Sequence, residues 1–431
     1  MRALHVFPHL ADDLAAGSDY YQHRLTRELL RLGVEVEVLT TCTRRVEPRA
    51  AFGLGWPSDY PAGAGMVDGV RVTRFPVPWS PPTSIGHLIS QPIMARWRRE
   101  EARNGVYPAG SDGAIEAFHR RALARPRAYD LLALLGRGPW SPGLISAANH
   151  AARRSDVVLA GFTPFATLWQ ATRAARRAGV PLVILALFHP EDIYHHFRIL
   201  YGCFQRADAL LAQTPYSAAL LARLLPGTRP LPLGLGIDPL ELDDPHISGA
   251  RFRQRYGIGD APLALFVGRK ERHKRYDLAI EAIDRVADPR ARLVLIGIDV
   301  DRRPVASPRA RYLGPLPRAD LLDAYDACDA FVLPSEHESF GVVFLEAWMR
   351  GKPVIGNARC QPVRSVIDDG VDGLLADDAA GLAESLQRLF GDPDQARRLG
   401  AAGRAKVLAR YTWERIGRSV YDLYQELAGG H

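Results

Sequence analysis

Short apolar runs alternate with stretches of helical periodicity along most of the chain. Residues 3–7 form the first apolar run, and apolar positions spaced along one helical face follow between residues 21 and 32. The same alternation returns between residues 156 and 212 and again between residues 263 and 356. Because strands that alternate with helices form parallel sheets, we expect an α/β protein with two Rossmann-like, doubly wound domains.

Two stretches depart from this alternation. Residues 226–260 are rich in Pro, Gly and Asp, which is typical of a linker. Residues 44–154 are irregular, with one clear strand at residues 70–75 and basic helical pieces around residues 96–103, so we expect an insertion there. The predicted parts are an N-terminal domain over residues 1–235 that carries the insertion 44–154, a C-terminal domain over residues 236–410, and a C-terminal helix over residues 411–431.

The positive charge of the chain is concentrated in its first half. The 431 residues carry a formal net charge of +7, and residues 1–240 hold 27 Arg against 19 Asp and Glu, whereas the remainder is close to neutral. This asymmetry indicates either an acidic partner for the N-terminal domain or a merely solvated basic surface. The basic half lacks the interleaved aromatic and basic pattern of an RNA-binding domain, so no nucleic-acid partner is expected.

Neither a metal-binding nor a membrane-spanning segment is evident in the sequence. The four cysteines lie far apart, without the close pairing of zinc sites or redox dithiols. No uninterrupted apolar run approaches the ~18 residues that a spanning helix needs, and the N-terminus lacks a signal-peptide pattern. We therefore expect a cytoplasmic protein.

The segment of residues 334–355 carries the most specific chemistry. It follows the predicted strand 330–333 and reads as loop, helix and strand, and ligands of open parallel sheets bind beyond such strand ends. The amides of residues 340–343 begin the helix and can bind phosphate. Glu346 lies among apolar residues, where it needs either ribose hydroxyls or an internal ion pair, and Glu338 faces either a sugar or a surface salt bridge.

Two cations follow the predicted strand of residues 263–267. Arg269 and Lys274 would both lie at the carboxyl edge of the same sheet, near the start of a helix. Two positive charges can neutralise a diphosphate and stabilise it as a leaving group. The pair therefore favours a nucleotide-diphosphate ligand for the C-terminal domain.

These residues make the chain closely similar to the retaining glycosyltransferases of family 4, which have the GT-B fold of two facing Rossmann-like domains. The resemblance rests on Glu338 and Glu346, which are separated by seven residues, on Arg269 and Lys274, and on Pro353-Val354-Ile355. It implies that a C-terminal helix crosses back onto the first domain.

The resemblance also implies a role for each matching position. Glu338 would contact the donor sugar, Glu346 the ribose, and Arg269 and Lys274 the diphosphate. His189, after the strand of residues 182–188, would lie at the reaction centre. The remaining donor contacts would come from the backbone at Leu313 and Gly314 for the base, from Phe340, Gly341, Val342 and Val343 for the phosphate, and from Gly17, which follows Ala16 where the family usually has glycine.

The implied activity is transfer of a sugar from a UDP- or GDP-sugar to an acceptor hydroxyl, with retention of configuration. The departing phosphate would itself help to deprotonate the acceptor on the same face, so neither a cofactor nor a metal is expected. Asp299-Val300-Asp301 resembles a metal-binding motif, but of a different glycosyltransferase fold. Three alternatives remain open from the residues alone: a GT-B-like nucleotide-sugar epimerase, a phosphorylase, and a non-catalytic protein that binds acidic ligands.

The acceptor is not identified by the sequence. The basic half should favour an acidic or lipid-linked acceptor, and the insertion holds Arg96, Trp97, Arg98 and Arg99 in succession. Arginines beside an interfacial tryptophan suit an anionic membrane surface or a phosphorylated or carboxylated acceptor. The sequence therefore leaves two possibilities, peripheral association with the inner face of the membrane and a soluble acceptor.

Overall fold

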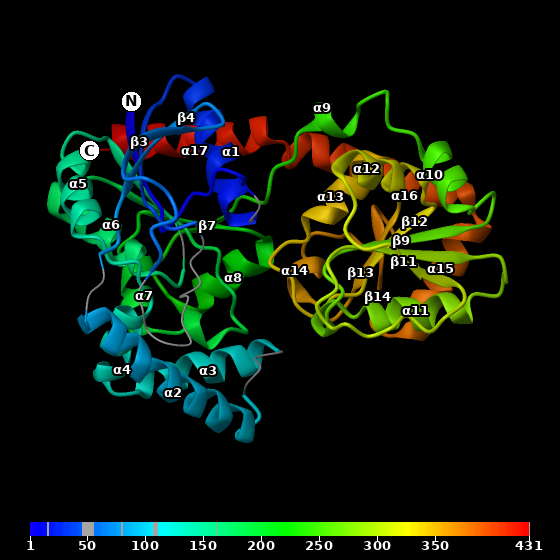
Figure 1. Cartoon of the computed structure of the whole chain (residues 1–431), viewed down its shortest axis with the longest axis horizontal. Coiled ribbons are helices and arrows are strands. Elements are labelled where there is room, and N and C mark those ends of the chain that lie inside the picture. The colour runs from blue at the N-terminus through cyan, green and yellow to red at the C-terminus, as the bar shows by residue number, and fades with distance from the viewer. Residues whose placement is uncertain (15–16, 45–55, 79–80, 107–110, 162, 431) are drawn as a thin grey trace. The chain divides into compact units, whose positions relative to one another are not determined.

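The computed structural model of the chain consists of two compact units. It describes residues 1–14, 17–44, 56–78, 81–106, 111–161 and 163–430, without the side chains of residues 81–87 and 90. Unit 1 comprises Met1–Leu233 with Ile416–His431, and unit 2 comprises Gly234–Arg415. Figure 1 shows the elements of each unit in chain order, and each unit is built around one sheet covered by helices.

The sheet of unit 1 has eight strands in the order β3-β4-β2-β1-β5-β6-β7-β8. All neighbours pair in parallel except β3 and β4, which are antiparallel. The strands β1, β5, β6 and β7 are apolar and almost wholly buried, as expected for strands covered on both faces. The strands are β1 (Arg2–Val6), β2 (Glu35–Thr41), β3 (Gly63–Val67), β4 (Val70–Phe75), β5 (Val157–Gly161), β6 (Leu182–Leu185), β7 (Ala209–Ala212) and β8 (Pro230–Pro232).

The helices of unit 1 include four that lie in the segment expected to be irregular. The strand expected at residues 70–75 and the helical pieces expected around residues 96–103 are present as β4 and within α2, but the described part of residues 44–154 also holds β3 and α3 to α5 and is more regular than expected. Ser111 and Ser141 cap α3 and α5 by accepting a backbone hydrogen bond. The helices are α1 (Gly17–Arg31), α2 (Pro81–Arg103), α3 (Asp112–Ala124), α4 (Arg127–Gly136), α5 (Pro142–Ala152), α6 (Ala166–Ala178), the short η1 (Ile193–His195), α7 (Arg198–Phe204) and α8 (Pro215–Leu224).

The sheet of unit 2 has six strands, all parallel, in the order β11-β10-β9-β12-β13-β14. The first strand of this unit in the chain, β9, lies in the middle of the sheet beside β12, and the strand order reverses direction between them. Ligands of doubly wound sheets bind at such a reversal. The strands are β9 (Leu263–Val267), β10 (Arg292–Ile296), β11 (Ala310–Tyr312), β12 (Ala330–Leu333), β13 (Val354–Asn357) and β14 (Gly373–Ala376).

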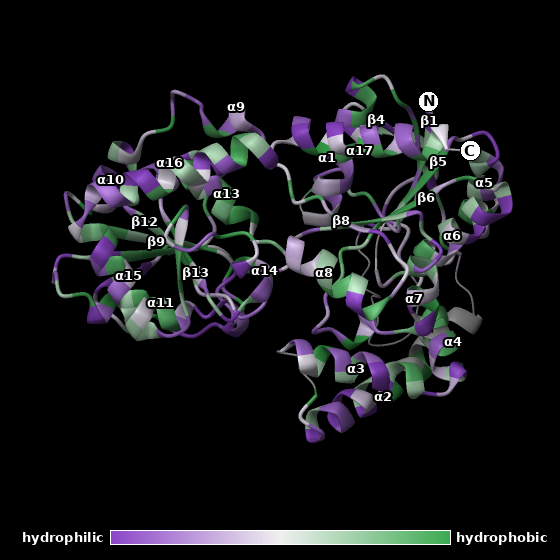
Figure 2. Ribbon diagram, turned by 180° about the vertical axis from the view of Figure 1, so that it is seen from behind, coloured by the Kyte–Doolittle hydropathy of each residue, from purple (hydrophilic) through white to green (hydrophobic). Residues whose placement is uncertain are grey.

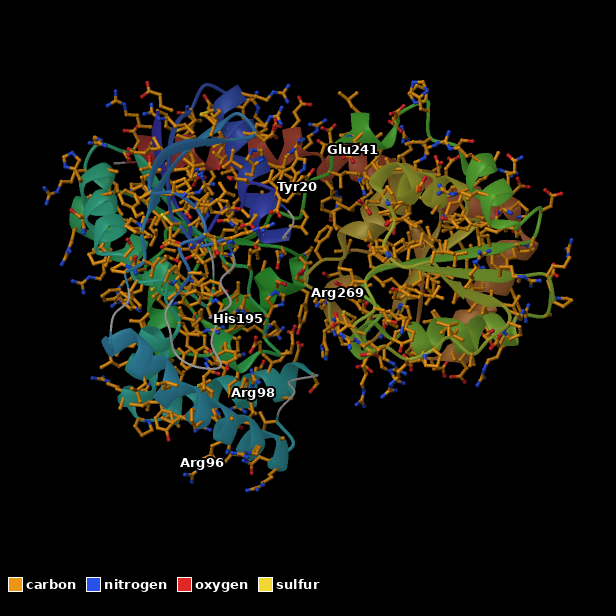
Figure 3. The ribbon with its side chains drawn as sticks, viewed as in Figure 1. Tyr20, Arg96, Arg98, His195, Glu241 and Arg269 are labelled. Atoms are coloured by element: carbon orange, nitrogen blue, oxygen red, sulfur yellow. The ribbon has the colours of Figure 1, made fainter. Side chains whose placement is uncertain are left out.

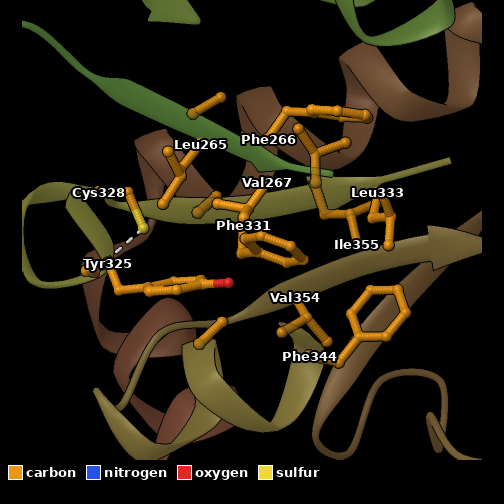
Figure 4. Close-up of a cluster of buried hydrophobic side chains, with 14 of the residues drawn as sticks. Leu265, Phe266, Val267, Tyr325, Cys328, Phe331, Leu333, Phe344, Val354 and Ile355 are labelled. Atoms are coloured by element: carbon orange, nitrogen blue, oxygen red, sulfur yellow. Dashed lines mark hydrogen bonds between the residues drawn. The ribbon is translucent and has the colours of Figure 1, made fainter. Parts of the chain in front are cut away.

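Helices cover this second sheet and bury its apolar residues. Tyr325, Phe331 and Phe344 lie in one buried cluster, and the rings of Phe331 and Phe344 meet edge to face with centroids 5.6 Å apart (Figure 4). Figure 2 shows the strands of both sheets as predominantly hydrophobic. The helices are α9 (Pro239–Leu242), α10 (Gly249–Tyr256), the short η2 (Arg272–Lys274), α11 (Tyr276–Arg285), α12 (Arg318–Ala327), α13 (Val342–Met349), α14 (Gln361–Arg364), α15 (Ala379–Gly391) and α16 (Pro393–Arg410).

The last helix, α17 (Trp413–Gly429), belongs to unit 1 from Ile416 onward. It lies beside α1 (Figure 1), and a Cβ atom added at Gly417 would come within 2.5 Å of the Cβ of Glu28. The Tyr424 hydroxyl, also on α17, lies 3.2 Å from Nε2 of His5 in β1. The terminal helix is thus part of the core of unit 1. In the described portions of the chain, no helix is long and apolar enough to cross a membrane.

Candidate functional site

The loops after β9 and β12 contact each other through a hydrogen bond and an ion pair where the strand order reverses in unit 2. The backbone N–H of Glu336 donates to the carbonyl of His273 at 2.8 Å, and the Arg275 guanidinium forms an ion pair with the Glu336 carboxylate at 2.7 Å. Two segments far apart in sequence therefore form one edge of the sheet.

This edge brings two of the sequence-predicted site residues into contact. Nζ of Lys274 lies 2.5 Å from Oε1 of Glu338, with 16% and 9% of the two side chains exposed. Arg269 instead pairs with Glu271 at 2.7 Å, and 58% of its side chain is exposed. Lys274, predicted to bind the diphosphate, is thus in direct contact with Glu338, predicted to bind the sugar. The second predicted cation, Arg269, remains accessible to solvent (Figure 3).

The start of α13 provides unbonded amides on the same side. Gly341 is the N-cap of the helix, with φ +87°, and makes no side-chain hydrogen bond to the first turn. The first-turn N–H groups of a helix have no intrahelical partner, so Val342 and Val343 present donors there. A Cβ atom at position 341 would lie 2.7 Å from the Phe344 ring, which explains the glycine. Phe340 is buried against the ring of Tyr411, with centroids 5.3 Å apart, and fixes the approach to the helix.

Glu346 in α13 has two protein partners that the sequence reasoning missed. Oε1 accepts from the Arg318 guanidinium at 2.6 Å and Oε2 accepts from the Tyr325 hydroxyl at 2.7 Å. Arg318 also pairs with Glu241 at 2.6 Å. Arg318 and Tyr325 are two helical turns apart on α12, a spacing that could have indicated a shared face.

Of the two partners that the sequence allowed for Glu346, ribose hydroxyls or an internal ion pair, the structure contains the ion pair. A carboxylate has about four acceptor positions, so the two bonds leave capacity for ribose hydroxyls. Burial raises the pKa of the Tyr325 hydroxyl, and the neighbouring Glu346 carboxylate raises it further. Tyr325 therefore remains a donor, and the role of Glu346 in ribose binding stays a prediction.

The predicted base-binding backbone lies after β11. Gly314 has φ +74°, and its carbonyl accepts a hydrogen bond from the N–H of Gly297 at 3.0 Å. The Tyr312 hydroxyl donates to the Gly297 carbonyl at 2.6 Å. Leu313 is half-buried and its N–H bonds to the carbonyl of Leu295 in β10. The segment is therefore held against the end of β10 with a defined backbone path.

The Asp299-Val300-Asp301 motif is engaged by protein side chains. Asp299 accepts from the buried Lys270 ammonium at 2.7 Å, and Asp301 accepts from the Tyr276 hydroxyl at 3.2 Å. Lys270 also donates to the Arg303 carbonyl at 2.7 Å. Within the residues that the structure covers, no group of three His, Cys, Asp or Glu residues is placed to hold a metal ion.

The predicted residues of unit 1 lie at the carboxyl ends of its strands. Gly17 begins α1, and nothing lies within 4 Å of a Cβ atom placed there. Ala16 lies outside the described residues. His189 follows β6, its Nδ1 lies 3.5 Å from Glu191, and its backbone N–H donates to Nδ1 of His195 at 3.2 Å. Burial lowers the pKa of His195 well below its ordinary value, so that ring is a neutral acceptor.

Two arginines flank the ring of Tyr194 in the same region. The guanidinium carbons of Arg137 and Arg98 lie 3.9 Å and 4.9 Å from the ring centroid. Both Nε atoms are buried without a hydrogen-bond partner, and neither arginine forms an ion pair within the described ranges. The Tyr194 hydroxyl donates to Gln91 at 2.9 Å. The structure therefore adds to unit 1 two arginines, Arg98 and Arg137, whose buried Nε atoms lack a hydrogen-bond partner and which the site prediction did not contain.

The expected surface cluster around Trp97 was wrong. Trp97 is 1% exposed, and its Nε1 donates to Glu101 at 2.9 Å. Arg96 points outward and pairs with Glu100, whereas Arg98 faces the rest of unit 1 (Figure 3). Successive helical residues are ~100° apart, so adjacent arginines and a tryptophan cannot share one face. Trp97 is a core residue and no interfacial anchor.

Comparisons with known proteins agree with this arrangement. Residues 250–406 match the family model described as "Glycosyl transferases group 1". A D-inositol 3-phosphate glycosyltransferase of Xylanimonas cellulosilytica is 28% identical over 96% of this chain and 92% of its own length. Two solved structures have the same fold. Sucrose-phosphate synthase from Thermosynechococcus elongatus is 18% identical, with a TM-score of 0.66 over 100% of both chains. Anabaena Alr3699/HepE in complex with UDP-glucose is 17% identical, with a TM-score of 0.64 over 99% of this chain and 100% of that one.

Proposed function

Because residues 250–406 match the group 1 glycosyltransferase model and the chain has the GT-B fold, we propose that it moves a sugar from a UDP-sugar to a hydroxyl of a phosphorylated acceptor, with retention at the anomeric carbon. The observation that carries the donor half is the contact of Lys274 with Glu338 beside the uncapped start of α13. Cations and free amides at one sheet edge are what a diphosphate requires. The similar fold of Alr3699/HepE, solved with UDP-glucose, supports UDP over GDP.

In the proposed reaction, the bond from the anomeric carbon to the diphosphate oxygen breaks while the acceptor oxygen bonds to that carbon on the same face. The proton of the acceptor hydroxyl passes to the departing diphosphate, so the products are UDP and the glycoside. Arg269, Lys274 and the amides of Val342 and Val343 would stabilise the charge that develops on the leaving group. This chemistry requires neither a metal nor a cofactor. The remaining rate acceleration would come from holding donor and acceptor in the reactive orientation.

The acceptor half of the proposal rests on Arg98 and Arg137. Burying a cation without a partner is costly, and a phosphate group would satisfy both guanidinium groups. They lie near the loop that follows β6, where the resemblance assigns His189 to the reaction centre. The full-length relative named for D-inositol 3-phosphate supports a phosphorylated cyclitol as the acceptor.

The test has three measurements. A thermal-shift panel of UDP-, GDP- and ADP-sugars should single out UDP. UDP release should then occur with D-inositol 3-phosphate and far less with unphosphorylated inositol, in the presence of EDTA. NMR of the product from an α-linked donor should give an α linkage. A β product removes the retaining mechanism, and loss of activity in EDTA that a divalent metal restores removes metal independence.

The variant Arg137→Gln tests the acceptor assignment independently of the donor assignment. Losing a charge-assisted contact costs about 1.5 to 3 kcal/mol, which is a rise of roughly 10- to 100-fold in the KM for the phosphorylated acceptor. Arg103→Gln removes an exposed charge from the end of α2 and should change little. If both variants use the phosphorylated acceptor like the parent enzyme, Arg137 does not bind the acceptor phosphate, whereas the donor assignment is unaffected.

A further inference from the structure

A groove on the helices of unit 1 has arginines at half of its lining positions. It lies among α4, α6 and α7, with α7 between the other two (Figure 1), and has a volume of about 680 Å³. Its charged lining consists of one aspartate, Asp130, and six arginines: Arg127, Arg173, Arg176, Arg177, Arg198 and Arg206.

The arginines form stripes on two helices that pack against each other. On α6, Trp169, Arg173 and Arg176 follow one another at intervals of three or four residues, which places them on one face. Arg198 begins α7, and Arg206 lies two turns further along the chain. The Arg173 guanidinium stacks 4.6 Å from the centroid of the Trp169 ring. Both stripes line the same groove.

The positive charge of the groove is largely uncompensated. Asp130, the one acidic residue, is already bonded by Arg198 through its backbone N–H at 2.9 Å and its guanidinium at 3.3 Å. The other five arginines form no ion pair with a carboxylate in the described part of the chain. Elsewhere exposed arginines find such partners, as Arg285 does with Glu281 and Arg290 does with Asp288. Like charges three or four residues apart destabilise a helix, so an anion that neutralises them would be favourable.

The groove is separate from the predicted reaction site. Arg176 and Arg177 lie at the end of α6, shortly before β6 begins, and Arg206 shortly precedes β7. These are the amino ends of the strands, whereas His189 follows the carboxyl end of β6. None of the residues that line the groove is among those predicted for the reaction site, so a ligand of the groove would not displace the acceptor from His189.

We propose that this groove binds a small polyanion carrying at least two phosphate groups. A guanidinium group binds phosphate through two parallel hydrogen bonds, and five of them lack a carboxylate partner here. The volume falls within the range of ~300 to 1,000 Å³ typical of small-molecule sites. The indole of Trp169 supplies an apolar surface for the rest of such a ligand. A free polyphosphorylated metabolite and a phosphorylated lipid headgroup share this chemistry.

Calorimetric titration of the whole 431-residue chain with inorganic tripolyphosphate tests the proposal. The double variant Arg173→Gln, Arg176→Gln should bind roughly 100- to 10,000-fold more weakly, since two charge-assisted contacts, each contributing roughly 10- to 100-fold, are lost. The matched control is Arg120→Gln, Arg153→Gln, which removes the same charge from exposed positions of unit 1 outside the groove. Both variants replace exposed side chains, and thermal unfolding checks that they fold.

A second measurement distinguishes a free polyphosphorylated metabolite from a phosphorylated lipid headgroup as the ligand. Sedimentation with phosphatidylcholine vesicles, with and without phosphatidylinositol 4-phosphate, is run on the same three proteins. Loss of tripolyphosphate binding in the groove variant alone supports a free polyanion, and loss of binding to phosphatidylinositol 4-phosphate vesicles in that variant alone supports a lipid headgroup. Equal binding by the groove and control variants overturns the proposal, as does a parent protein that binds neither probe.

Discussion

The hydroxyl of Tyr325 should contribute measurably to the stability of unit 2 because it bonds to a nearly buried carboxylate. Tyr325→Phe keeps the ring in the cluster with Phe331 and removes only the donor to Oε2 of Glu346, now at 2.7 Å. Hydrogen bonds to charged groups contribute about 1.5 to 3 kcal/mol, and the Arg318 bond to the other oxygen remains. We therefore expect a loss of about 1.5 to 3 kcal/mol, or a fall in Tm of roughly 3 to 12 °C.

The assay is urea unfolding, followed by the fluorescence of the seven tryptophans, of which Trp348 lies in the core of unit 2. Glu346→Gln removes the charge, and the double variant with Tyr325→Phe closes a thermodynamic cycle. A coupling free energy above about 0.5 kcal/mol is expected for groups in direct contact. If Tyr325→Phe unfolds within about 0.5 kcal/mol of the parent and the cycle shows no coupling, the hydroxyl does not hold the carboxylate and the reasoning fails. The same variant should weaken UDP binding less than Glu346→Gln does.

Three further outcomes follow from the geometry. Gly341→Ala should destabilise unit 2 by about 1 to 3 kcal/mol more than Gly351→Ala in urea unfolding. Both positions have positive φ, but only a Cβ atom at 341 meets a buried ring. Equal losses of unfolding free energy would contradict this. Trp97→Ala should cost about 3 to 5 kcal/mol of unfolding free energy, the value for a core residue, whereas a loss below about 1 kcal/mol would indicate a surface position. Burial lowers the pKa of His5 to about 3, so the unfolded chain binds a proton below pH ~6.5 that the folded chain does not. Stability should therefore fall with decreasing pH by about 1.4 kcal/mol per pH unit for this group, and His5→Gln should flatten that dependence in unfolding measured at pH 7 and pH 5.

The enzyme class and the fold could be read from the sequence. The alternation of apolar strands with helices predicted parallel sheets, because a strand buried on both faces must be apolar throughout. Glu338 and Glu346, together with Arg269 and Lys274, indicated a family 4 glycosyltransferase. In agreement, residues 250–406 match the group 1 glycosyltransferase model, and solved structures similar to the whole chain have the GT-B fold. These signals are local, since each lies within one or two consecutive elements. The individual roles of the site residues stay predictions.

Only the tertiary structure decided which of these residues meet and which side chains are buried. Lys274 contacts Glu338 because β9 lies beside β12, and a periodicity in sequence does not encode the order of strands in a sheet. Glu346 obtains its partners from α12 for the same reason. Trp97 is buried because other helices cover its side of α2, and the arginine groove exists because α4, α6 and α7 meet. A helical pattern fixes which residues share a face, but the packing of neighbouring elements fixes whether that face meets water, a ligand or the core.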